Sequence, residues 1–265
     1  MSFALFAATA RKNWVLLIIF FGVLTMYTTI MITMFNPEDM DAITAMLDLF
    51  PKDLMKAMGF SQLVTDLTSY LASWLYGLLM FGFPMVYCII LGNRLVAKKV
   101  DNSSMACILA TPHSRGKIIF TLGAYALFTV ALLFAGLFGV GVLFGEILHP
   151  GLLDIPSFLR LNVTTMLVNM VVIMISFLAS CIFNDSSLSI GFGAGIPIAF
   201  LMMNMLGGAS ENLSVIKEIS PYGWYDPLEL VKGEPVLWQN LAYAGIAAIL
   251  FTAALLIFRR RRLPL

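Results

Sequence analysis

The chain has 265 residues, of which 60% are hydrophobic and 12% are charged, and its mean hydropathy is +0.92. This composition excludes a soluble globular domain, because apolar runs of about twenty residues would have no face left for water. The net charge of +1 says nothing about partners, and the three cysteines, Cys88, Cys107 and Cys181, do not form a disulfide framework. We therefore predict an all-α membrane protein.

Six apolar runs have about the twenty residues that a helix needs to cross a bilayer. They lie at about 14–34, 70–91, 118–145, 161–183, 188–206 and 238–258, and form one transmembrane domain over 1–265. The stretch from Ser2 to Asn13 ends in Arg11 and Lys12, which suits a helix along the membrane interface, with a frayed terminus as the alternative. Because these basic residues follow the apolar opening stretch, no cleavable signal peptide is predicted.

The basic residues identify which side of the membrane carries the two termini. Six spans put both termini on one side, and that side has only two acidic residues, Asp101 and Asp185. Its eleven basic residues are Arg11, Lys12, Arg94, Lys98, Lys99, Arg115, Lys117, Arg259, Arg260, Arg261 and Arg262. The opposite side has five basic and thirteen acidic residues. Both termini are therefore predicted to be cytoplasmic.

Two outer loops, 35–69 and 207–237, are predicted to be structured. Asn36 can cap an amphipathic helix that runs to Phe50, and the carboxylates there follow its ends and exposed face, which does not favour a metal site. The second loop contains SPYGWYDP, whose Tyr222, Trp224 and Tyr225 suit the outer interface. A partly re-entrant hairpin is expected there.

Several catalytic classes lack their residues in this chain. No ionisable side chain lies well inside a span, which disfavours an ion-coupled carrier, because the coupling ion is bound near mid-membrane. The chain has no HExxH metalloprotease motif and no G-x-S-x-G nucleophile motif. It also has no G-x-x-x-x-G-K-[ST], so a second polypeptide must supply any ATP site. We predict no catalytic residue and no metal ligand.

Polar residues, prolines and methionines within the spans define a speculative substrate path. Its residues are Met80, Pro84, Asn169, Pro197, Met202, Asn204 and Met205. The prolines are expected to kink their spans, and flexible thioethers suit varied apolar cargo. Hydrogen bonding between helices is the favoured alternative for the two asparagines, and packing for the methionines.

The loop 93–117 is basic and lies between two spans. Ser103 or Ser104 can cap a short helix through Ala110 that places Met105, Ile108 and Leu109 on one apolar face. Thr111 and Pro112 are expected to begin the next helix as its cap and first-turn residue. An apolar face on the cytosolic side predicts a docking surface, and the alternative is that the helix lies on the bilayer.

This loop resembles one family. Matching residues stand in order at Asp101, Ile108, Leu109, Thr111, Pro112, Ser114, Arg115 and Lys117, with Ser103-Ser104 where the family carries Gly-Thr. They resemble the segment between spans two and three of ABC-2 type (type V) permeases, the membrane subunits of many bacterial ABC exporters. The six spans, the SPYGWYDP segment and the basic tail extend the resemblance over the whole length.

The resemblance implies a function and partners. The short helix would be a coupling helix that docks on an ABC ATPase subunit. Two ATPase copies and a second permease would complete the transporter, as a homodimer or as a heterodimer with a related permease. ATP and Mg would bind the ATPase, and no cofactor or nucleic acid would bind this chain.

The resemblance implies roles for individual residues, whereas the preference for a cargo comes from the apolar, methionine-rich spans without buried charge. Met105, Ile108 and Leu109 would make docking contacts, Ser104 and Thr111 would act as caps, and Arg115 would pair with an acidic ATPase residue or a lipid phosphate. The cargo would be amphipathic or hydrophobic, such as a drug, a membrane-active peptide or a lipid, exported across the bacterial cytoplasmic membrane. An ion-coupled carrier and a membrane scaffold with a cytosolic partner are the alternatives.

Overall fold

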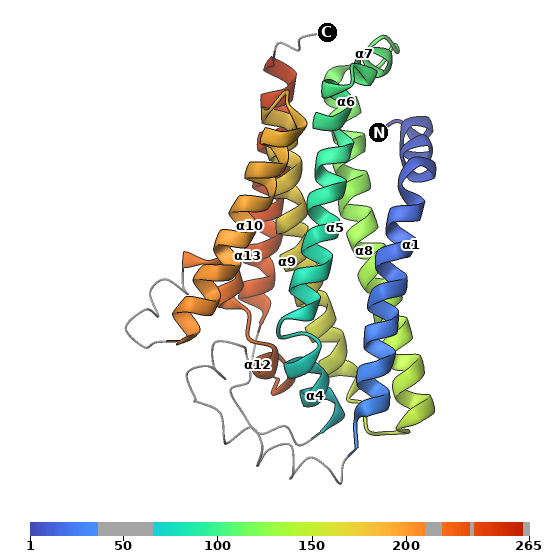
Figure 1. The fold of residues 1–265 in the computed structure, drawn as a ribbon, viewed down its shortest axis with the longest axis vertical. Coiled ribbons are helices and arrows are strands. Elements are labelled where there is room, and N and C mark those ends of the chain that lie inside the picture. Colours follow the sequence, from blue (N-terminus) through green and yellow to red (C-terminus); the bar gives the residue numbers. More distant parts are fainter. Residues whose placement is uncertain (37–65, 210–218, 234–235, 262–265) are drawn as a thin grey trace.

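The computed structural model describes residues 1–36, 66–209, 219–233 and 236–261, and this part of the chain contains helices and no strand. Its elements are α1 Phe3–Met34, α4 Leu67–Trp74, α5 Leu79–Leu95, α6 Ala97–Asp101, α7 Ser104–Leu109, α8 Arg115–Leu148, α9 Ile155–Ile182, α10 Ser186–Ala209, η3 Pro221–Trp224, α12 Pro227–Val231 and α13 Leu237–Arg260. Six helical segments are long and apolar enough to span a membrane, which confirms the predicted all-α, six-span class. Helix α1 begins and α13 ends at the same end of the bundle (Figure 1). We call this the terminal end and the opposite one the far end.

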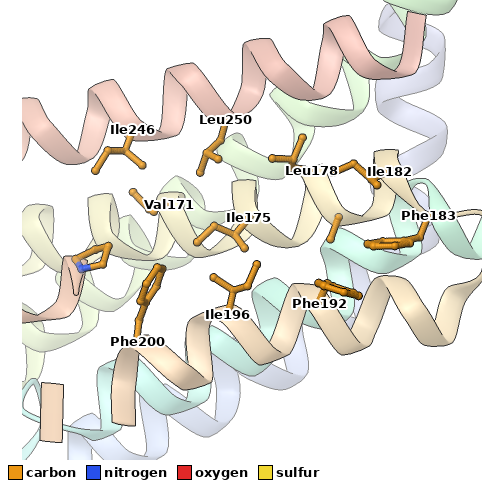
Figure 2. Close-up of a pocket in the computed structure, with 12 residues that line it drawn as sticks. Val171, Ile175, Leu178, Ile182, Phe183, Phe192, Ile196, Phe200, Ile246 and Leu250 are labelled. Atoms are coloured by element: carbon orange, nitrogen blue, oxygen red, sulfur yellow. The ribbon is translucent and has the colours of Figure 1, made fainter. Parts of the chain in front are cut away.

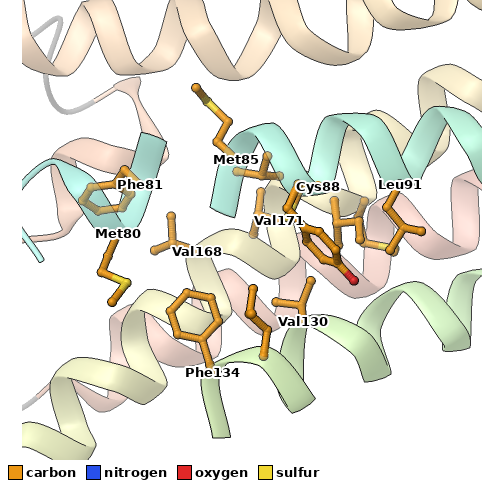
Figure 3. Packing of buried hydrophobic residues seen from close by; sticks show 14 of the residues in the cluster. Met80, Phe81, Met85, Cys88, Leu91, Val130, Phe134, Val168 and Val171 are labelled. Carbon is orange, nitrogen blue, oxygen red and sulfur yellow. The ribbon is translucent and has the colours of Figure 1, made fainter. Parts of the chain in front are cut away.

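Helix α9 is the central element of the bundle. It packs against α5, α8, α10 and α13, and most of its residues are buried. Figure 3 shows how apolar side chains of three helices meet, with Val168 of α9 between Met80 of α5 and Phe134 of α8. Because lipid is as apolar as these side chains, close packing and hydrogen bonds rather than water exclusion hold the helices together.

Helices α1 and α8 form a parallel pair that is tied at both ends. At the terminal end the backbone N–H of Ser2 donates to Oγ1 of Thr121 (2.9 Å). At the far end the ring Nε2 of His149 lies 3.0 Å from the carbonyl oxygen of Ile32. The predicted interfacial helix over Ser2 to Asn13 is therefore wrong: α1 continues unbroken from Phe3, because its first turns pack along α8.

The predicted second span, 70–91, is two helices. Helix α4 ends at Trp74, and α5 begins at Leu79 after a turn in which the N–H groups of Tyr76 and Met80 each bond the carbonyl five residues back. A side chain on Gly77 would collide with the Ser73 carbonyl oxygen, so this turn requires glycine. The break lies before the expected kink at Pro84, through which α5 stays helical.

The remaining spans extend beyond the apolar runs that predict them. Helix α8 has 34 residues and is about 51 Å long, against about 30 Å of hydrocarbon in a bilayer. Helix α9 begins at Ile155, with Pro156 in its first turn, where proline is well accommodated. An apolar run therefore marks the part of the helix expected in lipid, and the helix itself continues past that part.

The aromatic segment 219–233 lies inside the far end of the bundle. The rings of Tyr222 and Tyr225 pack edge-on against Phe81 of α5 and are 2% and 5% exposed. The prediction that these two tyrosines lie at the outer interface is therefore wrong, whereas Trp224 is exposed. The segment enters the bundle, as the expected re-entrant hairpin would, because both phenol groups find polar or sulfur partners there. Of the helix expected from Asn36 to Phe50, all residues after Asn36, including its carboxylates, lie outside the described residues.

The close contact of α5 with α9 predicts a sharp difference between two glycines of one helix. A Cβ added at Gly92 would lie 2.7 Å from Cβ of Ser176, next to the α9 backbone, whereas a Cβ at Gly82 meets nothing within 4 Å. Gly92→Ala should destabilise the protein by about 1–3 kcal/mol through overpacking. Gly82→Ala should leave stability unchanged or raise it by up to about 1 kcal/mol. Thermal unfolding in detergent measures both, and equal effects would contradict the packing described.

Candidate functional site

One face of α9 carries a ladder of polar side chains. Asn162, Thr165, Asn169, Ser176 and Ser180 follow at intervals of three, four, seven and four residues, which places them on the same side of the helix. All five are buried, and each bonds a neighbouring element at a point where that element is irregular. We call these five residues the α9 ladder.

The first such point is the proline of α5. Pro84 has no N–H, so the carbonyl of Met80, four residues earlier, has no partner within its own helix. The side-chain Nδ2 of Asn169 donates to that oxygen (3.3 Å) and to the Thr165 carbonyl (3.0 Å). An amide from α9 therefore replaces the hydrogen bond that the proline removes.

The same arrangement recurs at the proline of α10. Pro197 leaves the carbonyl of Gly193 without its helical partner. The hydroxyl of Ser176 donates to that oxygen at 2.9 Å. Ser176 lies seven residues from Asn169, so two turns of one helix face serve the prolines of two neighbouring helices.

Toward the far end, the α9 ladder bonds one tyrosine in each of two irregular segments, the α4–α5 turn and the segment 219–233. Nδ2 of Asn162 donates to the hydroxyl of Tyr76, which lies in the turn between α4 and α5 (2.9 Å). Oγ1 of Thr165 and the hydroxyl of Tyr225 are 2.7 Å apart. These bonds hold the α4–α5 turn and the segment 219–233 against the same helix.

Toward the terminal end, the α9 ladder bonds the backbone where α5 ends and α6 begins. The backbone N–H of Ala97 donates to the hydroxyl of Ser180 (2.6 Å), and that hydroxyl lies 3.4 Å from the carbonyl oxygen of Asn93. The side chain of Asn93 donates to the hydroxyl of Ser186 at the start of α10 (2.8 Å). The last turn of α5 is therefore fixed to α10 and the first residue of α6 to α9.

The α6–α7 segment, residues 97–114, projects at the terminal end (Figure 1). Ser103 adopts a left-handed conformation (φ 59°) between the two helices, and Oδ1 of Asn102 accepts hydrogen bonds from the N–H (3.2 Å) and hydroxyl (2.7 Å) of Ser104. The predicted short helix is present as α7, but neither Ser103 nor Ser104 caps it. The Asn102 side chain takes that role because it reaches forward over the turn.

The apolar face of α7 is turned toward the bundle. Met105 is fully buried (0% exposed), and Ile108 and Leu109 are half-buried against the core. The role of Met105 as a docking contact is therefore wrong, because its side chain completes the permease core. The surface that α7 offers to solution is instead Cys107 and Ala110.

The next helix begins later than predicted. Helix α8 starts at Arg115, and its cap is Ser114, whose hydroxyl accepts from the N–H of Lys117 (3.3 Å). The hydroxyl of Thr111 points back and donates to the Ile108 carbonyl (2.6 Å), so Thr111 closes α7 instead of capping α8. Pro112 accordingly lies in the exposed bend and not in a first helical turn.

Two arginine side chains form hydrogen bonds next to the C-terminal end of the α6–α7 segment, where α8 begins. Nη1 of Arg115 donates to the carbonyl of Arg261 after α13 (2.9 Å), so within the chain its partner is a backbone oxygen. Arg261 in turn donates to the carbonyl of Cys181 (2.6 Å) and to the side chain of Asn184, at the carbonyl-rich end of α9. Desolvation lowers the pKa of the Arg261 guanidinium below its ordinary value.

A third anchor reaches α1. The hydroxyl of Ser2 and Nε2 of His113 lie 3.1 Å apart. The α6–α7 segment is thus tied to α9 through Ala97 and to the start of α1 through His113, and Arg115, the first residue of α8 that follows it, is tied to the end of α13. Asp101, Ser114, Arg115 and Lys117 are exposed around it. Such a segment moves with the helices to which it is tied.

The seven residues of the speculative substrate path do not form one path. Met80, Pro84 and Asn169 meet, but they do so in the closed interior of the α5–α9 contact, where Asn169 serves the alternative that the sequence favoured, hydrogen bonding between helices. On α10, Pro197 is buried, whereas Met202 is exposed. Asn204 and Met205 are half-buried on the same helix. The sequence signal for the ladder was the spacing of its polar residues, which is visible from Thr165 to Ser180.

Comparison with protein families gives a match over nearly the whole chain. Residues 6–263 match the family model described as ABC-2 family transporter protein. The chain belongs to the ABC-2 transporter family. This ABC-2 protein is therefore a multi-pass membrane component of an ABC transporter, a permease of a class that generally does not catalyse ATP hydrolysis itself and associates with an ABC ATPase. The comparison with curated proteins gives no match.

The geometry of the α9 ladder predicts that the stability gained from its hydrogen bonds to Met80 and Gly193 depends on Pro84 and Pro197. Asn169→Leu should lower stability by about 1–3 kcal/mol, because it leaves the Met80 carbonyl without a donor. Pro84→Ala supplies a backbone N–H to the same carbonyl, so Asn169→Leu should cost less in the Pro84→Ala background. Thermal unfolding of the four proteins gives the coupling energy, which should be about 1 kcal/mol.

A second cycle, Ser176→Ala with Pro197→Ala, provides an independent replicate on α10. A third, Asn169→Leu with Pro197→Ala, provides the control, because these two residues do not share a carbonyl and their effects should add. Additive effects in the first two cycles would show that the prolines and the ladder are unrelated.

Proposed function

We propose that this ABC-2 permease is the membrane subunit of an ATP-driven exporter, working as a homodimer with two copies of a separate ATPase that carries ATP and Mg. The proposal follows from one observation: the α6–α7 segment lies at the terminal end, where it is hydrogen-bonded to α9 and to the residue before α1, and Arg115 directly after it is bonded to the end of α13. A load applied to a segment held in this way is transmitted to α1, α9 and α13.

The terminal end is proposed to face the cytoplasm of a bacterial cell. The described part of that end carries exposed basic residues on three separate elements, Arg11 on α1, Arg94 on α5 and Arg260 on α13. Basic residues near span ends favour the cytoplasmic side. An ATPase is cytoplasmic, so this orientation places the α6–α7 segment on the side where its partner would lie.

The contact with the ATPase is proposed to use the outward side of the α6–α7 segment. That side consists of Cys107, Ala110, Thr111 and Pro112, with Asp101 at the end of α6. Small and uncharged side chains allow close approach of a partner surface, and the flanking Arg115 and Lys117 can add charge pairing at the rim. Ile108 and Leu109 are half-buried, so they can contribute only their exposed edges.

A face of α10 supports the proposal of a second permease copy. Gly191, Gly195 and Ala199 recur every four residues and are exposed, and a Cβ at either glycine would meet nothing within 4 Å. Small residues at this spacing let two membrane helices approach closely. Helix α10 leaves most of its surface uncovered within one chain, and a partner helix would fill this flat stripe.

The proposed cargo is amphipathic or hydrophobic, a drug, a membrane-active peptide or a lipid. The described surface within the spans is apolar, with large exposed side chains such as Phe128, Phe192 and Ile249. A charged or sugar cargo would require polar groups along its route. The resemblance of the loop 93–117 to that of exporter permeases supports the proposal of ATP-driven export.

The docking surface predicts an uncoupled variant. Ala110→Trp should leave expression and membrane insertion unchanged, because Ala110 is exposed, and should reduce cargo-stimulated ATP hydrolysis and transport at least about tenfold by holding the two surfaces apart. Ala110→Ser is the matched small substitution and should be active. Ala8→Trp adds the same ring to an exposed position of α1 and should also be active. Full transport by Ala110→Trp would refute the assignment.

The α10 stripe predicts loss of the dimer without loss of the fold. Gly195→Leu should raise the dissociation constant of the permease dimer at least about tenfold, because its side chain projects from the stripe. Gly139→Leu on α8 is the control, since that glycine is also exposed with open space around it. Single-molecule photobleaching in liposomes measures both. Dimers of equal strength in the two variants would place the interface elsewhere.

A further inference from the structure

An apolar groove of about 480 Å³ runs between α10 and α13, with α9 as its floor. Figure 2 shows Ile246 and Leu250 of α13 facing Ile196 and Phe200 of α10 across Val171 and Ile175 of α9. The volume lies within the roughly 300–1,000 Å³ of small-molecule sites, but the lining offers almost no polar group. The occupant is therefore expected to be hydrocarbon along this length.

The groove is closed at one end and covers one leaflet. Toward the far end Pro221 crosses it, held by a hydrogen bond from the Tyr243 hydroxyl to the Pro221 carbonyl (2.8 Å) and by one from Ser220 to the Phe200 carbonyl (2.9 Å). From Val171 to Ile182 the floor rises about 17 Å along α9. Half of the hydrocarbon thickness is about 15 Å, so the groove matches the depth of the leaflet at the terminal end.

Positive charge lies in line with the open end. On α13 the groove residues Ile246 and Leu250 are followed on the same face by Ile257 and Arg260, at intervals of seven and three residues. Arg260 is exposed, and Arg261 beside it binds the carbonyl end of α9. The one acidic side chain of the adjoining loop is Asp185, whose carboxylate accepts from the N–H groups of Ser187 and Leu188.

We propose that this groove is a binding site for a phospholipid of the terminal-side leaflet, with one acyl chain between α10 and α13 and an anionic headgroup at Arg260. The length, the closed far end and the basic open end together fit a molecule with one apolar chain and one anionic group. The site does not depend on the direction of transport or on the ATPase proposed above.

Photolabelling of the full chain in phosphatidylcholine nanodiscs tests the proposal. The probe is phosphatidylglycerol with a diazirine in mid-chain, compared with the phosphatidylcholine analogue, and mass spectrometry locates the label. We expect label on α9 and α10 peptides that line the groove, with phosphatidylglycerol favoured. Arg260→Gln should reduce that preference about fivefold, the contribution of one basic residue near an anionic lipid, while Arg11→Gln on α1 should not change labelling of the groove.

A second variant fills the groove. Ile196 is 40% exposed, so Ile196→Trp should fold normally and reduce labelling of the groove several-fold; Leu132→Trp, at a position of α8 that is 47% exposed, is the control. Label spread evenly over lipid-facing helices and unaffected by Ile196→Trp would refute the site. Disulfide formation between chains through Ile196→Cys, without lipid label in the groove, would assign the groove to a second copy and also refute it.

Discussion

Where a spanning helix is interrupted, a backbone carbonyl loses the N–H that would bond it within the helix. In this membrane domain, side chains of α9 donate hydrogen bonds to such carbonyls. In hydrocarbon no water replaces a missing hydrogen bond, so a break in a spanning helix needs a donor from a neighbour. Asn169 and Ser176 supply donors at the two prolines, and Ser180 bonds the start of α6. The irregular points of α5, α6 and α10 are therefore arranged around one regular helix.

This arrangement connects the α6–α7 segment with the interior of the permease. The helix that holds the base of the segment through Ser180 also holds the two prolines and, at the far end, Tyr76 and Tyr225. A displacement of the segment is thus transmitted to α9, which bonds the α4–α5 turn, the segment 219–233, both proline sites and the start of α6. Helix α10, by contrast, has few buried residues and can face lipid or a partner. Such a design suits rigid-body movement of helices.

The sequence predicted the class and the number of spans correctly, because apolar length is a direct consequence of the bilayer. It also showed that Asn169 would bond a neighbouring helix, but it could not name the Met80 carbonyl as the partner. That pairing depends on how α5 and α9 are aligned, and the alignment is set by close packing at Gly92. The break at 75–78 was missed because its residues are as apolar as their neighbours.

The loop 93–117 shows a second limit. Amphipathic spacing predicted that Met105, Ile108 and Leu109 share a face, but spacing does not say whether that face meets a partner or the chain itself. The burial of Met105 shows that this face packs against the bundle of the same chain. The two possible caps before α8, Thr111 and Ser114, differ by three residues, and the bond from Thr111 back to Ile108 decides for Ser114.

The most direct test is a pair of cryo-electron microscopy structures of the permease with its ATPase in a lipid bilayer, with and without bound nucleotide. If α9 organises the moving parts, Nδ2 of Asn169 will lie within hydrogen-bond distance of the Met80 oxygen, and Oγ of Ser176 within that of the Gly193 oxygen, in both states. The α6–α7 segment will be displaced together with the terminal end of α9. A state in which either carbonyl has lost its ladder donor, or in which the segment moves while α9 stays in place, would contradict the account.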